Sequence, residues 1–121
     1  MTEFVFDTYA IIEVIKGNPN YASYLDATPI INQFILAELC YCLLKEAGIE
    51  KAFEYSDKYG RFVSSIDTSA IKEAAAFRYQ HKKQKIAFTD AIGYIQAKKL
   101  GIKFLTGDKE FESLPNIEFI K

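Results

Sequence analysis

Short runs of apolar, β-prone residues alternate along this chain with longer segments of helical pattern, and this alternation restricts its fold more than any other feature. The first run lies at 3–6, and two more lie near the end of the chain at 102–106 and 116–120. Strands separated by helices form mainly parallel sheets with right-handed crossovers. We therefore predict a doubly wound α/β fold, with a mainly parallel sheet of about four or five strands and helices on both faces.

Local signals predict the other elements. Two further strands are expected, at 29–33 and 61–66. Helix starts and stops are marked by Pro19, by Asp67 as an N-cap, and by glycines. Helices are predicted at 8–18, 19–27, 34–48, 49–60, 67–84 and 89–101, with a turn or short helix at 109–114.

Length, charge and cysteine content narrow the class of protein. The chain has 121 residues, which suits a single domain over 1–121, and a formal net charge of −1, which offers no general attraction for nucleic acid. No apolar run approaches the ~20 residues of a membrane span, so a cytoplasmic protein is expected. Cys40 and Cys42, two residues apart on one predicted helix, point to different sides and are not expected to form a disulfide, and with His81 far away in sequence they form no zinc motif.

Four of the 16 acidic residues stand alone in apolar stretches. A carboxylate in such surroundings is unfavourable unless it is paired, hydrogen-bonded or bound to a metal ion. Three of them, Asp7, Glu38 and Asp90, have no Lys or Arg three or four residues away, where a neighbour on a helix would lie. The four acids are Asp7 in "FVFDTYAII", Glu38 in "FILAELCYCLL", Asp90 in "IAFTDAIGYIQA" and Asp108 in "IKFLTGD".

The predicted fold brings these acids toward one edge of the sheet. Asp7 and Asp108 each follow a strand, and ligands of open parallel sheets bind at the carboxyl ends of strands, where the strand order reverses. Glu38 and Asp90 lie near the starts of helices. Carboxylates gathered there would repel one another unless a divalent cation joined them, and oxygen ligands favour Mg²⁺ or Mn²⁺. Such a centre suits phosphodiester hydrolysis.

Each acid also has a simpler explanation. Asp7 and Asp90 could be helix N-caps, Asp108 could be a turn residue beside glycine, and Glu38 could form a salt bridge. Three threonine hydroxyls next to the acids could orient carboxylates or water. Capping or strand propensity would also explain these threonines, and this simpler explanation is favoured for Thr106. These hydroxyls belong to Thr8, Thr89 and Thr106.

Three stretches resemble the PIN-domain family, and most of all its VapC-type members, the toxins of toxin–antitoxin pairs. They are "FVFDTYAIIEVI", "FILAELCYCLLKE" and "FTDAIGYIQAKKLGIKFLTGDKEFESLPNIEFI". The resemblance spans nearly the whole chain and is weakest in the middle helices. Each motif alone is weak, but their order and spacing together are specific.

The resemblance implies a Mg²⁺- or Mn²⁺-dependent endoribonuclease. It implies that the acidic quartet is Asp7, Glu38, Asp90 and Asp108, both as catalytic residues and as metal ligands. It also implies a homodimer, a small antitoxin partner and an RNA substrate. The alternative function is a non-catalytic PIN-like module that binds RNA or protein. A receiver-like phosphotransfer domain is disfavoured, because neither "FVFDTY" nor "FLTGD" has the adjacent acids or the lysine that it requires.

The acidic balance of the chain departs from what an RNA-binding protein suggests. Contacts to phosphate must then come from local clusters of lysine, whose simpler explanation is a solvated helix end. Tyr9 could stack on a base or belong to the core. The candidate RNA-binding lysines are Lys82, Lys83, Lys85, Lys98 and Lys99, with Lys103 beside them.

Overall fold

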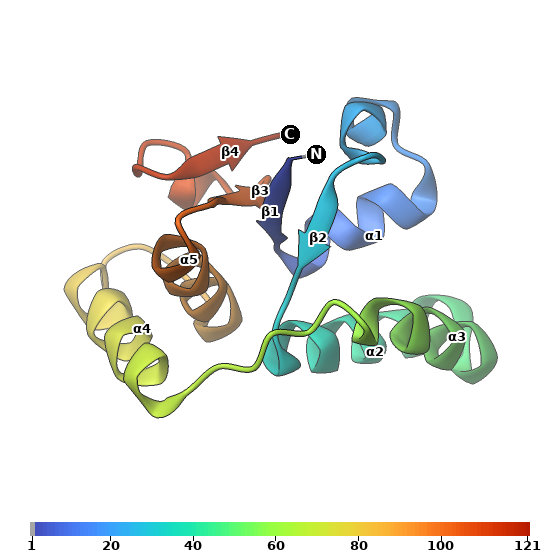
Figure 1. The fold of residues 1–121 in the computed structure, drawn as a ribbon, viewed down its shortest axis with the longest axis horizontal. Helices are drawn as coiled ribbons and strands as arrows, with labels where there is room; N and C mark the ends of the chain where they lie inside the picture. The colour runs from blue at the N-terminus through green and yellow to red at the C-terminus, as the bar shows by residue number, and fades with distance from the viewer. Residues whose placement is uncertain (1) are drawn as a thin grey trace.

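A four-stranded parallel sheet forms the centre of the molecule. The computed structural model describes residues 2–121. The strand order is β2-β1-β3-β4, and every neighbouring pair runs parallel (Figure 1). The strands are β1 (Glu3–Phe6), β2 (Thr28–Ile30), β3 (Lys103–Thr106) and β4 (Ile117–Phe119). The predicted parallel α/β fold is confirmed.

Helices connect the strands and cover both faces of the sheet. In Figure 1, α1 lies on one side of β1, and α4 and α5 lie on the other. The α-helices are α1 (Thr8–Lys16), α2 (Gln33–Ala47), α3 (Ile49–Gly60), α4 (Thr68–Gln80) and α5 (Phe88–Leu100), and the 3₁₀ segments are η1 (Pro19–Tyr24) and η2 (Lys109–Phe111). Asp67 caps α4 through the Ala70 amide, and Pro19 opens η1, as predicted.

The order of the strands reverses direction at β1. The chain passes from β1 to β2 on one side, and then returns across β1 to β3 on the other. A right-handed crossover in each direction places the connecting helices on opposite faces, which leaves a crevice at the carboxyl ends of β1 and β3. Asp7 and Asp108 follow these two strands, so the reversal brings together acids that are about a hundred residues apart in sequence.

The core is formed by the strands and the inner faces of α1, α2 and α5. Val5, Phe104 and Leu105 are fully buried in the sheet. Helix α5 lies close to β3 because Gly93 has no side chain: a Cβ there would stand 2.7 Å from the Phe104 ring. The same helix contributes an unbroken buried stretch at 91–97, which explains why its sequence is apolar around its full circumference.

The predicted strand at 61–66 is not formed. Only Val63 pairs, through a single parallel bridge to Ile31 just beyond β2. The amides of Phe62 and Val63 instead bond back to Tyr59 and Gly60 at the end of α3. This turn uses the donors that a fifth strand would need, so the sheet stops at four strands.

Helix α4 is shorter than the predicted 67–84. It ends at Gln80, where the amide of His81 bonds to the Phe77 carbonyl, and the chain turns through 81–84 toward α5. The Arg78 side chain reaches across this turn to the Ile86 carbonyl, 2.8 Å away. This contact holds the return of the chain close to α4. The cysteines Cys40 and Cys42 are free thiols, as expected.

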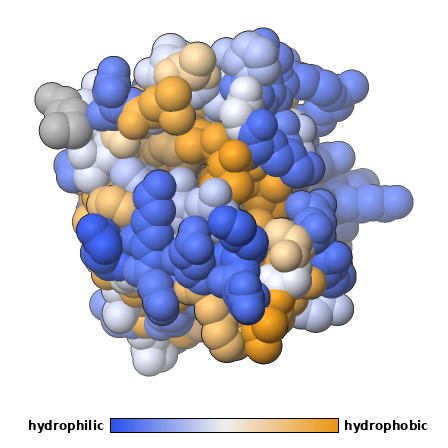
Figure 2. Space-filling model, turned by 90° about the vertical axis from the view of Figure 1, so that its right-hand side faces the viewer, coloured by the Kyte–Doolittle hydropathy of each residue, from blue (hydrophilic) through white to orange (hydrophobic). Residues whose placement is uncertain are grey.

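An apolar band crosses one face of the molecule. Figure 2, which views the right-hand side of Figure 1, shows a band of hydrophobic residues running between polar margins. A cavity of about 230 Å³ between α1, β2 and α3 is lined mainly by apolar side chains, among them Val14, Leu25 and Tyr59. None of the helices within 2–121 combines the length and hydropathy needed to cross a membrane.

Candidate active site

The crevice at the carboxyl ends of β1 and β3 is an acidic cavity of about 260 Å³. All four isolated acids of the sequence line it, although they come from four separate parts of the chain. Its lining residues are Asp7, Tyr9, Glu38, Asp90, Gly107 and Asp108. The structure therefore brings the predicted quartet together and places an exposed tyrosine and a glycine beside it.

Asp7 is the most buried and the most firmly held of these acids. Its side chain is 3% exposed. One carboxylate oxygen accepts a hydrogen bond from the Ala10 amide at 2.7 Å, and the other accepts one from the Thr106 hydroxyl at 2.5 Å. Asp7 is thus an N-cap, as its simpler explanation proposed, and it lines the cavity as well.

Asp108 occupies the matching place after β3. Its side chain accepts a hydrogen bond from the Glu110 amide at 3.0 Å, which makes it the N-cap of η2. Its own amide donates to the Thr106 hydroxyl at 3.1 Å. Thr106 therefore links the two strand-end acids, donating to Asp7 and accepting from Asp108.

Gly107, which the sequence did not single out as a site residue, gives the cavity its shape. A Cβ at this position would lie 2.5 Å from the main-chain oxygen of Ile120 and 3.3 Å from the Tyr9 ring. The chain after β3 can therefore pass close to the C-terminal segment only because residue 107 is glycine. The signal available in the sequence was the T-G-D order itself.

Glu38 and Asp90 are placed by helices. Glu38 lies in the second turn of α2, and Asp90 is in the first turn of α5. The N-cap position of α5 is Ala87, so the explanation of Asp90 as an N-cap is wrong. Within 2–121, neither carboxylate forms a hydrogen bond or an ion pair, so the salt-bridge explanation of Glu38 is wrong as well.

The electrostatics of the cavity disfavour its own negative charges. Burial, together with repulsion from Asp108 and Glu38, raises the pKa of Asp7 to about 6, even though its two hydrogen bonds act in the opposite direction. Burial, and then repulsion from Asp7, Glu38 and Asp108, raises the pKa of Asp90 to about 8. No lysine or arginine contributes to either shift, so the charges are not compensated by a cationic side chain.

The three predicted hydroxyls differ in their contacts. Thr106 contacts both strand-end acids, although strand propensity was the favoured explanation for it. Thr8 is 4% exposed, and its hydroxyl has no hydrogen-bond partner among the described residues. Thr89 is half-buried in the first turn of α5, and its hydroxyl forms no hydrogen bond within 2–121.

The candidate RNA-binding lysines separate into two groups. Lys98 and Lys99 lie at the far end of α5 from Asp90, ~12 Å along the helix axis. Lys99 forms an ion pair with Glu73 at 2.6 Å, and Lys103 lies 3.9 Å from Glu118. The other lysines, in the turn at 82–85, precede the end of α5 that carries Asp90. Only this second group lies at the same end of α5 as the acidic cavity.

The residues of the cavity fit a hard divalent cation. They offer carboxylate oxygens and no competing nitrogen or sulfur ligand, and two of the carboxylates have no other partner. Within 2–121, no group of three or more His, Cys, Asp or Glu side chains is placed so that it could hold a metal ion together. An open arrangement of this kind suits Mg²⁺, which is usually held by one or two carboxylates and keeps several waters.

Comparison with known proteins identifies the family of the chain. The family model described as "PIN domain" matches residues 4–117. The chain belongs to the PIN domain family. Comparison with curated protein sequences gives no match.

Solved structures of PIN proteins share the whole fold. VapC20 from Mycobacterium tuberculosis, described as a sarcin-ricin loop cleaving toxin, is 16% identical, with a TM-score of 0.79 over 99% of this chain and 100% of that one. VapBC2 from Rickettsia felis, bound to a DNA fragment from its promoter, is 20% identical, with a TM-score of 0.74 over 99% of this chain and 100% of that one. A chain of a toxin–antitoxin complex from Klebsiella pneumoniae is 18% identical, with a TM-score of 0.76 over 95% of this chain and 95% of that one. At these identities, the likeness shows that the fold is shared.

Proposed function

We propose that this PIN domain is a divalent-metal-dependent endoribonuclease, and that it is the toxin of a toxin–antitoxin pair. The observation that carries the proposal is the acidic cavity: four carboxylates without a cationic partner converge where the strand order reverses. Such an arrangement is unfavourable for the fold alone, because it raises the pKa of Asp7 and of Asp90. A site that binds a cation and a phosphodiester explains why the carboxylates are there.

The proposed ligands of the cation are Asp7, Glu38, Asp90 and Asp108. Bound there, Mg²⁺ or Mn²⁺ would supply positive charge for the phosphoryl oxygens and acidify a water molecule. Asp7 is the best-oriented ligand, because hydrogen bonds from Ala10 and Thr106 hold both of its oxygens. Each of those oxygens has a further lone pair available. The carboxylates of Glu38 and Asp90 form no hydrogen bond or ion pair within 2–121 that would compete with a cation. The Thr106 hydroxyl orients the strand-end acids, because it donates to the Asp7 carboxylate and accepts from the Asp108 amide.

The chemistry that we propose is hydrolysis by water. Attack by water, and not by the ribose 2′-hydroxyl, leaves a 5′-phosphate and a 3′-hydroxyl on the RNA fragments. The end groups of the products therefore test the proposed mechanism separately from the proposed activity. Fragments that end in a 2′,3′-cyclic phosphate would contradict it.

The proposal includes a protein partner. One of the similar structures is described as a toxin–antitoxin complex, and another is described as a sarcin-ricin loop cleaving toxin. The apolar band in Figure 2 is the kind of surface that a soluble domain usually covers with a partner. A homodimer remains a prediction from the resemblance.

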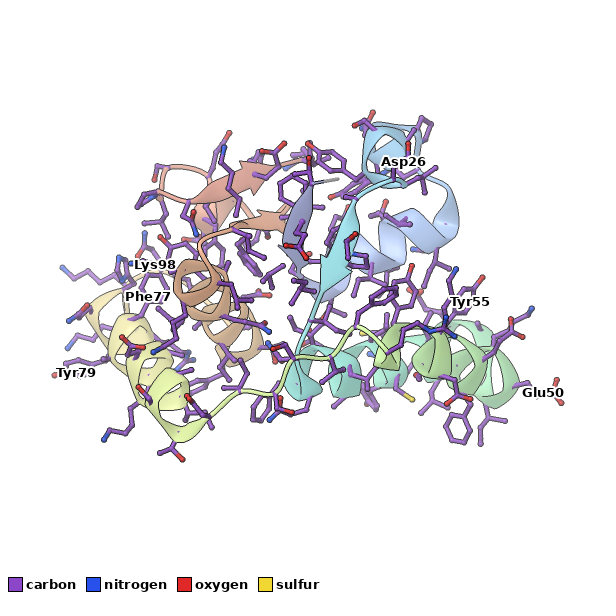
Figure 3. All side chains as sticks on the ribbon, viewed as in Figure 1. Asp26, Glu50, Tyr55, Phe77, Tyr79 and Lys98 are labelled. Carbon is purple, nitrogen blue, oxygen red and sulfur yellow. The ribbon has the colours of Figure 1, made fainter. Side chains whose placement is uncertain are left out.

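Cleavage of cellular RNA tests the proposed function. Purified protein, freed of any partner, would be incubated with RNA in Mg²⁺, in Mn²⁺ and in EDTA. We expect cleavage only with the cation, and its loss in Asp90→Asn and Glu38→Gln. The matched controls are Asp57→Asn and Glu50→Gln on α3, which remove exposed acids that do not line the cavity (Glu50 is labelled in Figure 3).

Two results would contradict the proposal. Cleavage that persists in EDTA would exclude the role of the cation. Folded protein that binds RNA but cleaves none of it with either cation would favour the non-catalytic module.

A further inference from the structure

A second cavity, of about 340 Å³, lies on the other side of the first turn of α5. It is formed by α4, by the turn that follows it and by the start of α5. Its lining residues are Ala75, Arg78, Tyr79, Lys82, Gln84 and Phe88. It contains no acidic residue and combines two cationic side chains with two aromatic ones.

The charge of this region is opposite to that of the rest of the chain. Between Glu73 and Asp90 there is no acidic residue, while Arg78, Lys82, Lys83 and Lys85 are cationic in a protein whose net charge is −1. Neither Arg78 nor Lys82 forms an ion pair within 2–121. Both charges are therefore available to an anion from solvent.

Arg78 is held in position for such an anion. Its Nε donates to the Ile86 carbonyl at 2.8 Å, and its guanidinium lies 4.3 Å from the centroid of the Phe88 ring. The two terminal nitrogens of the guanidinium have no hydrogen-bond acceptor in the described part of the chain. An arginine fixed at one edge and free at the other presents a planar fork, which suits phosphate oxygens.

The aromatic side chains of this cavity are exposed. Tyr79 is 70% exposed and points outward from α4 in Figure 3, whereas Phe77 points inward toward α5. Phe88 is 51% exposed. The Lys82 ammonium lies 4.7 Å from the Tyr79 ring centroid. An exposed aromatic ring beside uncompensated cations is the combination that binds unpaired nucleotides, by stacking on the base and by pairing with the phosphate.

The position of the cavity relates it to the acids. Phe88 lines this cavity and Asp90 lines the acidic one; the two residues are ~3 Å apart along the axis of α5 and lie on roughly opposite sides of its first turn. A chain of nucleotides that crosses the first turn of α5 could therefore lie in both cavities.

We propose that the cavity of Arg78, Tyr79, Lys82 and Phe88 binds one unpaired nucleotide of the RNA whose chain continues into the acidic cavity, with its phosphate on Arg78 and Lys82 and its base on Tyr79. This proposal rests on the proposed function of the acidic cavity. It makes single-stranded RNA the preferred substrate, because a paired base would first have to be unpaired and unstacked before it could meet the tyrosine.

Binding measured without cleavage tests this proposal. The affinity of the protein in EDTA would be measured by fluorescence anisotropy, with a labelled single-stranded oligoribonucleotide and with the same sequence in a duplex. The test variant is Tyr79→Ala/Lys82→Ala. The control is Phe53→Ala/Lys51→Ala on α3, which removes an aromatic ring of similar exposure (53%) and one lysine, at the opposite side of the molecule.

We expect the test variant to bind the single strand at least about tenfold more weakly, and the control less than about twofold more weakly. Lys82→Ala alone should lower the slope of log affinity against log salt by about one, and Tyr79→Ala alone should leave that slope unchanged. Equal effects of both double variants, equal effects on duplex and single strand, or competition by polyglutamate as strong as that by RNA would each overturn the proposal.

These results are separable from the proposed function. Metal-dependent cleavage with no role for Tyr79 and Lys82 in binding would exclude this cavity and leave the acidic site standing. Binding of single strands that depends on both residues, in a protein that never cleaves RNA, would exclude the nuclease and keep the nucleotide-binding cavity.

Discussion

The two acids that follow strands and the two acids carried by helices line the same cavity, but they are held in different ways. Asp7 and Asp108 accept hydrogen bonds from main-chain amides, and the Thr106 hydroxyl contacts both residues. Glu38 and Asp90 form no hydrogen bond within 2–121. The side chains of the strand-end acids therefore form hydrogen bonds that stabilise the fold, whereas the carboxyl groups of the helix-borne acids line the cavity without such bonds.

This difference teaches which substitutions can separate function from stability. Removing either strand-end acid also removes a helix cap, and removing Asp7 leaves the buried Thr106 hydroxyl without its acceptor as well. Removing a helix-borne acid takes away repulsion and leaves no donor unsatisfied. The proposed site is thus half built from residues that the fold requires and half from residues that it tolerates.

The largest expected effect is on RNA cleavage. Asp7→Ala and Asp90→Ala should each lower the rate at least about a hundredfold, since loss of a residue that merely supports a metal ligand costs 10- to 100-fold. Their stabilities should differ: Asp7→Ala should lose about 1 kcal/mol or more with its cap, and Asp90→Ala should lose none at pH 8. Cleavage assays and urea denaturation would measure the two effects. A stable Asp7→Ala would remove the distinction between the two pairs.

The next largest effect is the loss of stability when a glycine near one of the acids is replaced by alanine: Gly107 precedes Asp108, and Gly93 lies one turn after Asp90. Gly107→Ala places a Cβ 2.5 Å from the Ile120 main-chain oxygen, which cannot rotate away, so we expect a loss of about 3 kcal/mol. Gly93→Ala on α5 meets the Phe104 ring at 2.7 Å, but alanine favours the helix by about 1 kcal/mol, so the net loss should be smaller. Thermal or urea unfolding would rank them, and the opposite order would show that the chain around Gly107 adapts readily.

Removing the Thr106 hydroxyl, which bonds to Asp7, should lower the stability more than removing the Thr8 hydroxyl, which has no hydrogen-bond partner among the described residues. Thr106→Val removes the donor to the buried Asp7 carboxylate, and we expect a loss of about 1.5–3 kcal/mol above pH 6. Thr8→Val replaces a buried hydroxyl without a partner, and it should be neutral or slightly stabilising. Equal losses in the two valine variants would mean that the hydrogen bond to Asp7 contributes little.

The last expected effect is a change in how stability depends on pH in EDTA. An acid whose pKa is raised by folding binds its proton more tightly in the folded state, so stability falls as pH rises from the unfolded to the folded pKa. For Asp7 this interval runs from 3.8 to about 6, and for Asp90 from 3.8 to about 8. Asp90→Asn should therefore flatten the decline between about pH 6 and 8, by at most about 1.4 kcal/mol per pH unit.

Urea denaturation of the wild type and of Asp90→Asn across this interval would measure the difference. Other titrating groups are common to both proteins and cancel. Asp57→Asn, which removes an exposed acid, serves as the control and should follow the wild type. Parallel curves for the wild type and Asp90→Asn would show that Asp90 is charged in the folded protein throughout.

Several features of this protein follow from short stretches of sequence. The alternation of apolar runs and helical segments predicted the parallel α/β fold, and Asp67 and Pro19 marked helix starts correctly, because capping and periodicity act over a few residues. The four acids could be found in the same way, since each is isolated among apolar neighbours. Segment 61–66 shows the limit: its β propensity was real, but the end of α3 took its hydrogen-bond donors.

Only the tertiary structure decided which groups meet. The Thr106 hydroxyl and the Asp7 carboxylate are 99 residues apart, and the need for glycine at 107 comes from the Ile120 carbonyl in the last segment of the chain. The basic and aromatic cavity likewise depends on how the turn after α4 brings Phe88 against Arg78. Most helices and strands and the four acids could be predicted because their signals lie within a few neighbouring residues. The contacts between them are set by the order of strands in the sheet and by the packing of helices on it.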